Sequence, residues 1–143
     1  MDYTAVFEAD GDGFIVLFPA IPQIVTGGAT FSEARNNASD ALEVALLTLV
    51  HDNVELPSDF RRDMDDSASH IVHISASVAA KLEFIIAFRQ SGLTRVALAE
   101  RLGKAETEVR RMLNPYHGTK LAMLETAIGA LGKRFVLKVE HAA

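Results

Sequence analysis

Two short apolar runs open the chain, residues 3–9 and residues 14–18, and the polar sequence Asp10-Gly11-Asp12-Gly13 separates them. Runs of this length that are rich in β-branched and aromatic residues predict strands. A glycine-rich connection between two such runs is typical of a tight turn. The pattern therefore predicts a β-hairpin at the start of the chain.

A periodic stretch follows and predicts a helix from Thr30 to about Asp52. Its first residues, Thr30-Phe31-Ser32-Glu33, form a capping box. Its apolar residues recur on one helical face: Ala34, Ala38, Ala41, Leu42, Ala45, Leu46 and Leu49. Residues 24–26 and 71–74 predict a third and a fourth strand. The fold class expected for this half is α+β, a small β-β-β-α-β domain in which one helix covers a sheet.

The second half is expected to be all-helical. Helical spacing of apolar residues predicts a helix from about Ser77 to Gln90, with Leu82, Ile85, Ile86 and Phe88 largely in the core. A further helix is predicted over residues 120–131, before Gly132. The final run, residues 134–140, alternates apolar and polar positions and predicts a strand with no partner in its own half.

Dimerisation would give this last strand a partner, because the same strand of a second subunit can pair with it. Phe135, Leu137 and Val139 are the apolar positions of the strand. We expect these three residues at or near a homodimer contact, and the sequence leaves open whether assembly stops at the dimer or reaches a tetramer.

Between these helices, residues 94–113 have the pattern of a helix-turn-helix. Leu98 and Leu102 share one helical face, and the small Ala99 permits a close crossing by the next helix. Gly103 can adopt the left-handed conformation that ends the first helix, and Val109 and Met112 return apolar contacts. A unit of this kind places its second helix in the major groove of DNA.

Two positions depart from the usual helix-turn-helix pattern. Lys104 follows the turn glycine where an apolar residue is common, which leaves a more open turn or a phosphate contact as alternatives. Ala105 occupies the capping position, where serine or threonine would be stronger. Glu106 and Glu108 partly compensate through the helix dipole.

The residues expected to contact DNA follow from this placement. With Val109 and Met112 facing inward, the groove-facing positions are Glu106, Thr107, Arg110 and Arg111. The alternative for Glu106 and Arg110, four residues apart, is a simple ion pair on a solvated face. Phosphate contacts are expected at Arg95, Thr119 and Lys120, which stand at the starts of helices, and at Lys104.

The charge of the chain is unevenly divided. Residues 1–66 hold three Lys and Arg against thirteen Asp and Glu, a net charge of −10, whereas residues 67–143 hold eleven against six, a net charge of +5. The positive half carries the helix-turn-helix pattern, as phosphate binding requires. DNA would repel the negative half, so we expect this half to face a basic protein.

Length and composition limit the remaining possibilities. The expected domains are residues 1–75, in which the polar run of about residues 57–69 suggests a linker, and residues 76–143. Domains of this size are marginally stable alone, which favours association. The 143 residues contain no cysteine, no secretory signal and no apolar run of roughly 20 residues. We therefore expect a soluble, cytoplasmic protein that does not bind membranes.

With these elements placed, the sequence resembles the HicB antitoxins of bacterial type II toxin-antitoxin systems, in the branch with a Cro/C1-type helix-turn-helix. The resemblance covers nearly the whole chain. It rests on the order and spacing of Asp10-Gly11-Asp12-Gly13-Phe14, Phe18-Pro19-Ala20-Ile21-Pro22, Val25-Thr26-Gly27-Gly28-Ala29-Thr30, Glu33-Ala34 and residues 77–133. The family implies a partial RNase H-like N-terminal domain that blocks a small basic mRNA-cleaving HicA toxin. It also implies a C-terminal domain that represses the operon by binding operator DNA.

Other chemistry has weaker support. Asp10, Asp12 and Gly13 resemble the start of a calcium loop, but the closing glutamate is missing and turn formation explains them. His70 and His73 would point to opposite faces of a strand and cannot bind one metal, so surface or linker positions are expected. A ligand-sensing transcriptional regulator and a magnesium-dependent nuclease are the alternatives to an antitoxin. The predicted strands supply few carboxylates for magnesium, and we expect no enzymatic activity, cofactor or metal.

Overall fold

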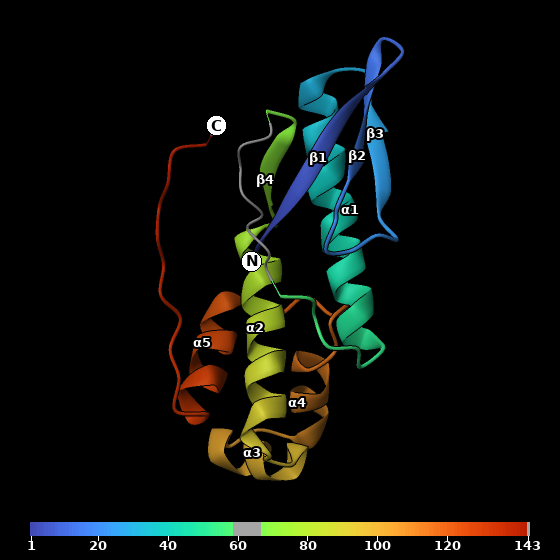
Figure 1. The fold of residues 1–143 in the computed structure, drawn as a ribbon. Coiled ribbons are helices and arrows are strands. Elements are labelled where there is room, and N and C mark those ends of the chain that lie inside the picture. Colours follow the sequence, from blue (N-terminus) through green and yellow to red (C-terminus); the bar gives the residue numbers. More distant parts are fainter. Residues whose placement is uncertain (59–66, 143) are drawn as a thin grey trace. The chain divides into compact units, whose positions relative to one another are not determined.

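The computed structural model describes residues 1–58 and 67–142, and it divides into two compact units, Met1–Ala79 and Ala80–Ala143. The first unit contains a four-stranded antiparallel sheet in the order β3-β2-β1-β4 (Figure 1). Its strands are β1 (Asp2–Asp10), β2 (Gly13–Leu17), β3 (Val25–Gly28) and β4 (Ser69–His73). The hairpin, the third strand and the fourth strand are therefore present in the predicted order.

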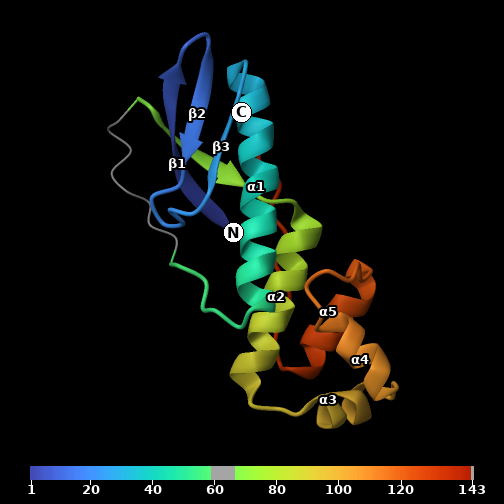
Figure 2. The same cartoon turned by 90° about the vertical axis from the view of Figure 1, so that its right-hand side faces the viewer.

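Helix α1 (Phe31–His51) packs on one face of this sheet (Figures 1 and 2). It begins at the expected cap, where the Glu33 backbone N–H donates to Thr30 Oγ1 at 3.1 Å. The side of α1 that meets the sheet consists of Ala34, Ala38, Leu42, Leu46 and Val50. Tyr3, Ala5 and Phe7, at alternate positions of β1, are buried with them. Alternate side chains of the strand and one face of the helix thus pack together in one core.

Gly27 and Gly28 let β3 lie close to its neighbours. A Cβ atom on Gly27 would stand 2.2 Å from the Phe14 carbonyl oxygen, and one on Gly28 would stand 2.5 Å from the Ala34 backbone nitrogen. The Asn37 side-chain amide also donates to the Gly27 carbonyl at 2.8 Å. These contacts join the edge strand to the first turns of α1.

The second unit is helical, as predicted. It consists of most of α2 (Ala76–Ser91) and of α3 (Arg95–Leu102), α4 (Glu106–Met112) and α5 (Leu121–Ala130) (Figure 2). Its larger buried apolar side chains come from all of these helices: Leu82, Phe84, Ile85, Leu98, Val109, Met112, Leu124 and Ile128.

Two predictions about connecting segments need correction. The linker expected over residues 57–69 is wrong at its end, because Ser69 begins β4 and the Ala68 carbonyl already accepts from the Phe7 backbone N–H at 2.8 Å. Residues 59–66 of that segment lie outside the described residues. The strand predicted over residues 134–140 is not formed in the single chain, where residues 133–142 have no regular secondary structure. A strand needs a neighbouring strand to complete its hydrogen bonds.

Within the described parts of the chain, no helix combines the length and the apolar character that crossing a membrane would require.

Candidate nucleic-acid interface

The turn between α3 and α4 is set by one threonine and one glycine. Thr94 begins α3, and its Oγ1 accepts from the Ala97 backbone N–H at 3.1 Å. Gly103 ends α3 at φ 63°, in the left-handed region. The Lys104 and Gly103 backbone N–H groups donate to the carbonyls of Ala99 (3.0 Å) and Glu100 (3.2 Å), which is the hydrogen-bond pattern of a Schellman motif.

The inner faces of α3 and α4 are closed by the predicted apolar residues. Leu98, Ala99, Val109 and Met112 are all buried. Thr107, Arg110 and Arg111 are exposed on α4, so the side chains expected to contact DNA point away from this core. Within the described residues no hydrogen bond or ion pair is found for the side chain of Arg111.

Glu106 gathers two of the predicted DNA-contacting arginines. One of its carboxylate oxygens lies 3.4 Å from Arg95 Nε, and the other lies 3.1 Å from Arg110 Nη2. The ion pair between Glu106 and Arg110, weighed above as the alternative to base contact, is therefore present in the free protein. The other ion pair, between Glu106 and Arg95, joins the start of α3 to the first turn of α4.

Lys104 forms a second, weaker pair along α4, with its Nζ 3.7 Å from Glu108 Oε2. The turn before it is closed rather than open, because Lys104 N bonds back to Ala99 as described. Ala105 provides no side-chain cap to α4. The acidic Glu106 and Glu108 instead occupy its first turn, where they favour the helix dipole.

Thr119 and Lys120 stand at the start of α5 as predicted. Lys120 is the exposed N-cap residue of α5 and makes no side-chain cap bond. Thr119 Oγ1 accepts from Lys81 Nζ at 2.7 Å, and the same ammonium donates to the Arg111 carbonyl oxygen at 3.2 Å. Sequence analysis missed Lys81. The spacing offered a signal, because Lys81 lies one turn before Ile85 on a helix whose neighbouring positions are apolar.

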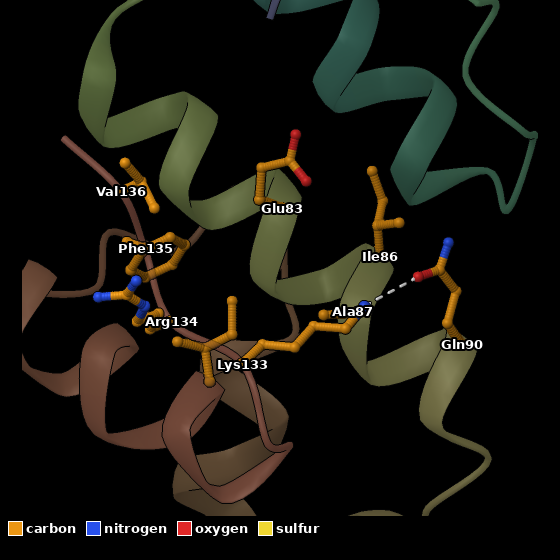
Figure 3. Close-up of a pocket in the computed structure, with 9 residues that line it drawn as sticks. Glu83, Ile86, Ala87, Gln90, Lys133, Arg134, Phe135 and Val136 are labelled. Carbon is orange, nitrogen blue, oxygen red and sulfur yellow. Dashed lines mark hydrogen bonds between the residues drawn. The ribbon is translucent and has the colours of Figure 1, made fainter. Parts of the chain in front are cut away.

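The tail, residues 133–142, exposes most of its apolar side chains. Leu137 is 83% exposed and Val139 is 89% exposed, whereas Phe135 is half-buried. The start of the tail runs beside α2 and lines a groove with it (Figure 3). There Lys133 Nζ donates to Gln90 Oε1 at 3.3 Å, which is the dashed line in Figure 3.

The two histidines of β4 do lie on opposite faces, since His70 pairs with Ala5 and His73 with Asp2. His73 is a surface residue with Nδ1 2.7 Å from Asp2 Oδ1. His70 is not a simple surface residue, which corrects that expectation. Its ring packs against Phe7 and Phe31 with centroids 5.1 and 5.0 Å apart. Among the described residues, no group of three or more His, Asp or Glu could hold a metal ion.

Charge follows the structural division. Residues 67–79 contain no Lys, Arg, Asp or Glu, so the first unit carries the net charge of −10 and the second carries +5. The chain is thus a small protein made of an acidic α+β unit and a basic helical unit, and the basic unit presents an arginine-bearing helix.

Known proteins are similar to this sequence over most of its length. Antitoxin HicB of Escherichia coli (strain K12) is 38% identical over 127 residues, which cover 87% of this chain and 88% of that protein. Antitoxin HicB 2 of Photorhabdus laumondii subsp. laumondii is 34% identical over 137 residues, covering 96% and 95% of the two chains. No family model matches the sequence. One chain of a solved HicA3 and HicB3 toxin-antitoxin complex is 27% identical with a TM-score of 0.44, over 52% of this chain and 99% of that chain.

At this identity and coverage, the chain belongs to the HicB antitoxin family.

Proposed function

We propose that this chain is the antitoxin of a HicA/HicB-type pair, acting in the cytoplasm. Residues 1–75 form a partial RNase H-like domain that binds and neutralises a small mRNA-cleaving toxin. Residues 76–143 form a helix-turn-helix domain that binds operator DNA and represses the operon. Relatives named as HicB antitoxins that span 87–96% of the chain support the first role.

The observation that carries the second role is the α3–α4 pair. Its left-handed Gly103, its buried Leu98 and Val109 and its outward Arg110 and Arg111 match what a major-groove helix needs. In this arrangement Arg110 and Arg111 contact bases, with Thr107 and Glu106 beside them.

Contacts to the DNA backbone come from the surrounding elements. Arg95, Lys104, Thr119 and Lys120 bind phosphates without reading sequence. Since one α4 helix reads only a few base pairs, two copies joined through Phe135, Leu137 and Val139 bind a two-fold-related operator. The exposure of Leu137 and Val139 in the single chain supports this assembly.

The DNA-binding role is tested with Ala variants of four basic residues in the full chain. Arg110→Ala and Arg111→Ala should each cost about 1 to 3 kcal/mol of operator affinity and relax the preference for one base of each half-site. Arg95→Ala and Lys120→Ala are the matched controls, which should weaken operator and random DNA alike and flatten the salt dependence. An unaltered ratio of operator to random affinity in both arginine variants of α4 would show that α4 does not read the bases.

The toxin-binding role is tested in cells that express a HicA toxin, with the product of any short reading frame found beside that of this chain as the first choice. The full chain should restore growth, and the Arg110→Ala and Arg111→Ala variants should restore it equally because the acidic unit is intact in both. Failure of the wild-type chain to restore growth contradicts the antitoxin role, whatever its DNA binding.

A further inference from the structure

Lys81 is a charged residue in an apolar place. Its side chain is 5% exposed, and its neighbours along α2, Ala80, Leu82, Phe84 and Ile85, are buried with it. Lysine is almost never buried this fully unless its ammonium has partners. Its partners therefore indicate what the residue does.

Those partners lie on two different elements. Lys81 Nζ donates to the Arg111 carbonyl oxygen in the last turn of α4 (3.2 Å) and to Thr119 Oγ1 immediately before α5 (2.7 Å). Between these two points the chain forms the exposed connection from Asn114 to Gly118. One ammonium thus joins the end of α4 to the beginning of α5.

Both partners are neutral, so the charge of Lys81 is not cancelled locally. No ion pair to a carboxylate is found for Lys81 within residues 1–58 and 67–142. Burial lowers the pKa of Lys81 from 10.5 to about 8, which leaves the side chain mainly charged at neutral pH. A methionine would fill similar space without desolvating a charge. The contribution of Lys81 to stability therefore does not by itself explain a lysine at this position.

The hydrogen bond to Thr119 has a directional consequence. A hydroxyl group has one proton to donate and lone pairs to accept with. Because Lys81 donates to Thr119 Oγ1, the hydroxyl proton is directed away from Lys81, and the adjacent positive charge makes it a stronger donor. Lys120, exposed next to Thr119, is a further group that a phosphate oxygen could meet.

We propose that Lys81 is a positioning residue for DNA binding: it fixes the end of α4 against the start of α5 and directs the Thr119 hydroxyl toward a backbone phosphate. The inference rests on the DNA-binding role proposed above. Lys81 itself touches no nucleotide in this account, because its ammonium is enclosed by the protein. Its effect reaches DNA through the Arg111 carbonyl and the Thr119 side chain.

Three variants of the full chain test this inference: Lys81→Met, Thr119→Val and Lys120→Met. Each is measured for unfolding by urea and for affinity to two duplexes over a salt series. One duplex spans the region upstream of the chain's own reading frame, and the other is a scrambled sequence of equal length. Lys120→Met is the matched control, since it removes an exposed lysine beside the same hydroxyl.

Lys81→Met should fold at least as stably as the wild type yet bind both duplexes about tenfold more weakly, with the same salt slope. Thr119→Val should bind several-fold more weakly, also with the same slope. Lys120→Met should lose affinity together with about one unit of slope, as expected for a direct phosphate contact. Opposite effects on stability and affinity are what a purely structural lysine would not produce.

Wild-type affinity in folded Lys81→Met overturns the inference. So does a salt slope that falls in this variant as it does in Lys120→Met, because that result would make Lys81 a direct phosphate ligand. If Lys81→Met does not fold, Thr119→Val decides, and wild-type affinity there overturns the inference. Wild-type protein that binds neither duplex refutes the DNA-binding role and this inference with it. Binding that weakens in Lys120→Met alone refutes only this inference.

Discussion

The acidic unit and the basic unit reach compact structures by different means. In the unit Met1–Ala79, β3 lies so close to its neighbours that no Cβ atom fits at Gly27, which faces the backbone of β2, or at Gly28, which faces the backbone of α1. In the unit Ala80–Ala143, the chain turns sharply between short helices. Gly103 is needed there for its positive φ, although a Cβ atom added to it would have nothing within 4 Å. The same residue type thus meets a steric need in one unit and a conformational need in the other.

This contrast matters for function because the two units differ also in charge. A sheet unit of net charge −10 suits a basic protein partner, and a helical unit of net charge +5 suits DNA. If each unit has its own core and its own partner, a change in one core should leave the function of the other intact.

The largest effects are expected from matched core substitutions. Leu42→Ala in α1 and Leu98→Ala in α3 each remove a fully buried side chain and should cost about 2 to 5 kcal/mol of unfolding free energy. Leu42→Ala should impair toxin neutralisation but not DNA binding, and Leu98→Ala should do the reverse. Urea unfolding followed by circular dichroism, with both functional assays, measures this. A single transition that both variants weaken equally would mean that the two units unfold as one.

Glycine substitutions should separate the steric need from the conformational one. Gly28→Ala places a Cβ atom 2.5 Å from the Ala34 backbone nitrogen and should destabilise by about 1 to 3 kcal/mol. Gly103→Ala has space but a φ of 63° and should cost about 1 kcal/mol. Gly103→Asn should recover part of that loss, because asparagine tolerates the left-handed region, whereas Gly28→Asn should be worse than Gly28→Ala. Equal losses for Asn and Ala at both positions would remove the distinction.

The buried lysine of the basic unit predicts an effect of pH that the acidic unit should not share. Below pH 8, Lys81 is charged in both the folded and the unfolded chain. Between about pH 8 and 10.5 the folded chain has lost this proton and the unfolded chain has kept it. The unfolded state then binds more protons, so the free energy of unfolding rises with pH, by roughly 3 kcal/mol over this window. Comparison with Lys81→Met at each pH isolates this contribution from other groups, and parallel curves for the two proteins would contradict it.

The smallest effect is expected at the charged surface of the basic unit. Glu106→Gln removes the carboxylate that pairs with Arg95 and Arg110, all partly exposed, and should cost about 0.5 kcal/mol or less of stability. Glu108→Gln, which removes the longer pair with Lys104, is the control and should cost less. Thermal unfolding at low and high salt measures both changes. A loss above 1 kcal/mol at Glu106 would indicate a structural role that the exposure of the pair does not suggest.

Local signals in the sequence predicted much of this fold. The threonine caps at Thr30 and Thr94 and the turn at Gly103 involve residues no more than five positions apart. They could therefore be predicted from short stretches of the sequence. The inward Leu98 and Val109 follow from helical periodicity alone. For the same reason the exposed face with Arg110 and Arg111 could be assigned.

Contacts between distant residues were not predictable in this way. Lys81 meets Thr119 across 38 positions, and His70 meets Phe7 across the sheet, so neither partner appears in the local pattern. The predicted tail strand fails in one chain because the pattern describes a side-chain alternation and not the neighbour that a strand requires. Ser69 was assigned to a linker because its neighbours in the sequence are polar. The sequence gives no sign that the Phe7 backbone N–H donates to the Ala68 carbonyl oxygen.

The Glu106 carboxylate competes with any anionic ligand for the guanidinium groups of Arg95 and Arg110. Arg95 and Arg110 are already occupied in the free protein, so a polyanion that engages them exchanges one partner for another and gains less than it would from unoccupied guanidinium groups. An arbitrary DNA sequence offers only phosphate in this exchange. A matching half-site adds hydrogen bonds to base edges, which the carboxylate cannot imitate. If α4 binds DNA as proposed, the Glu106 carboxylate weakens the attraction to all DNA and leaves the preference for one sequence to the base contacts.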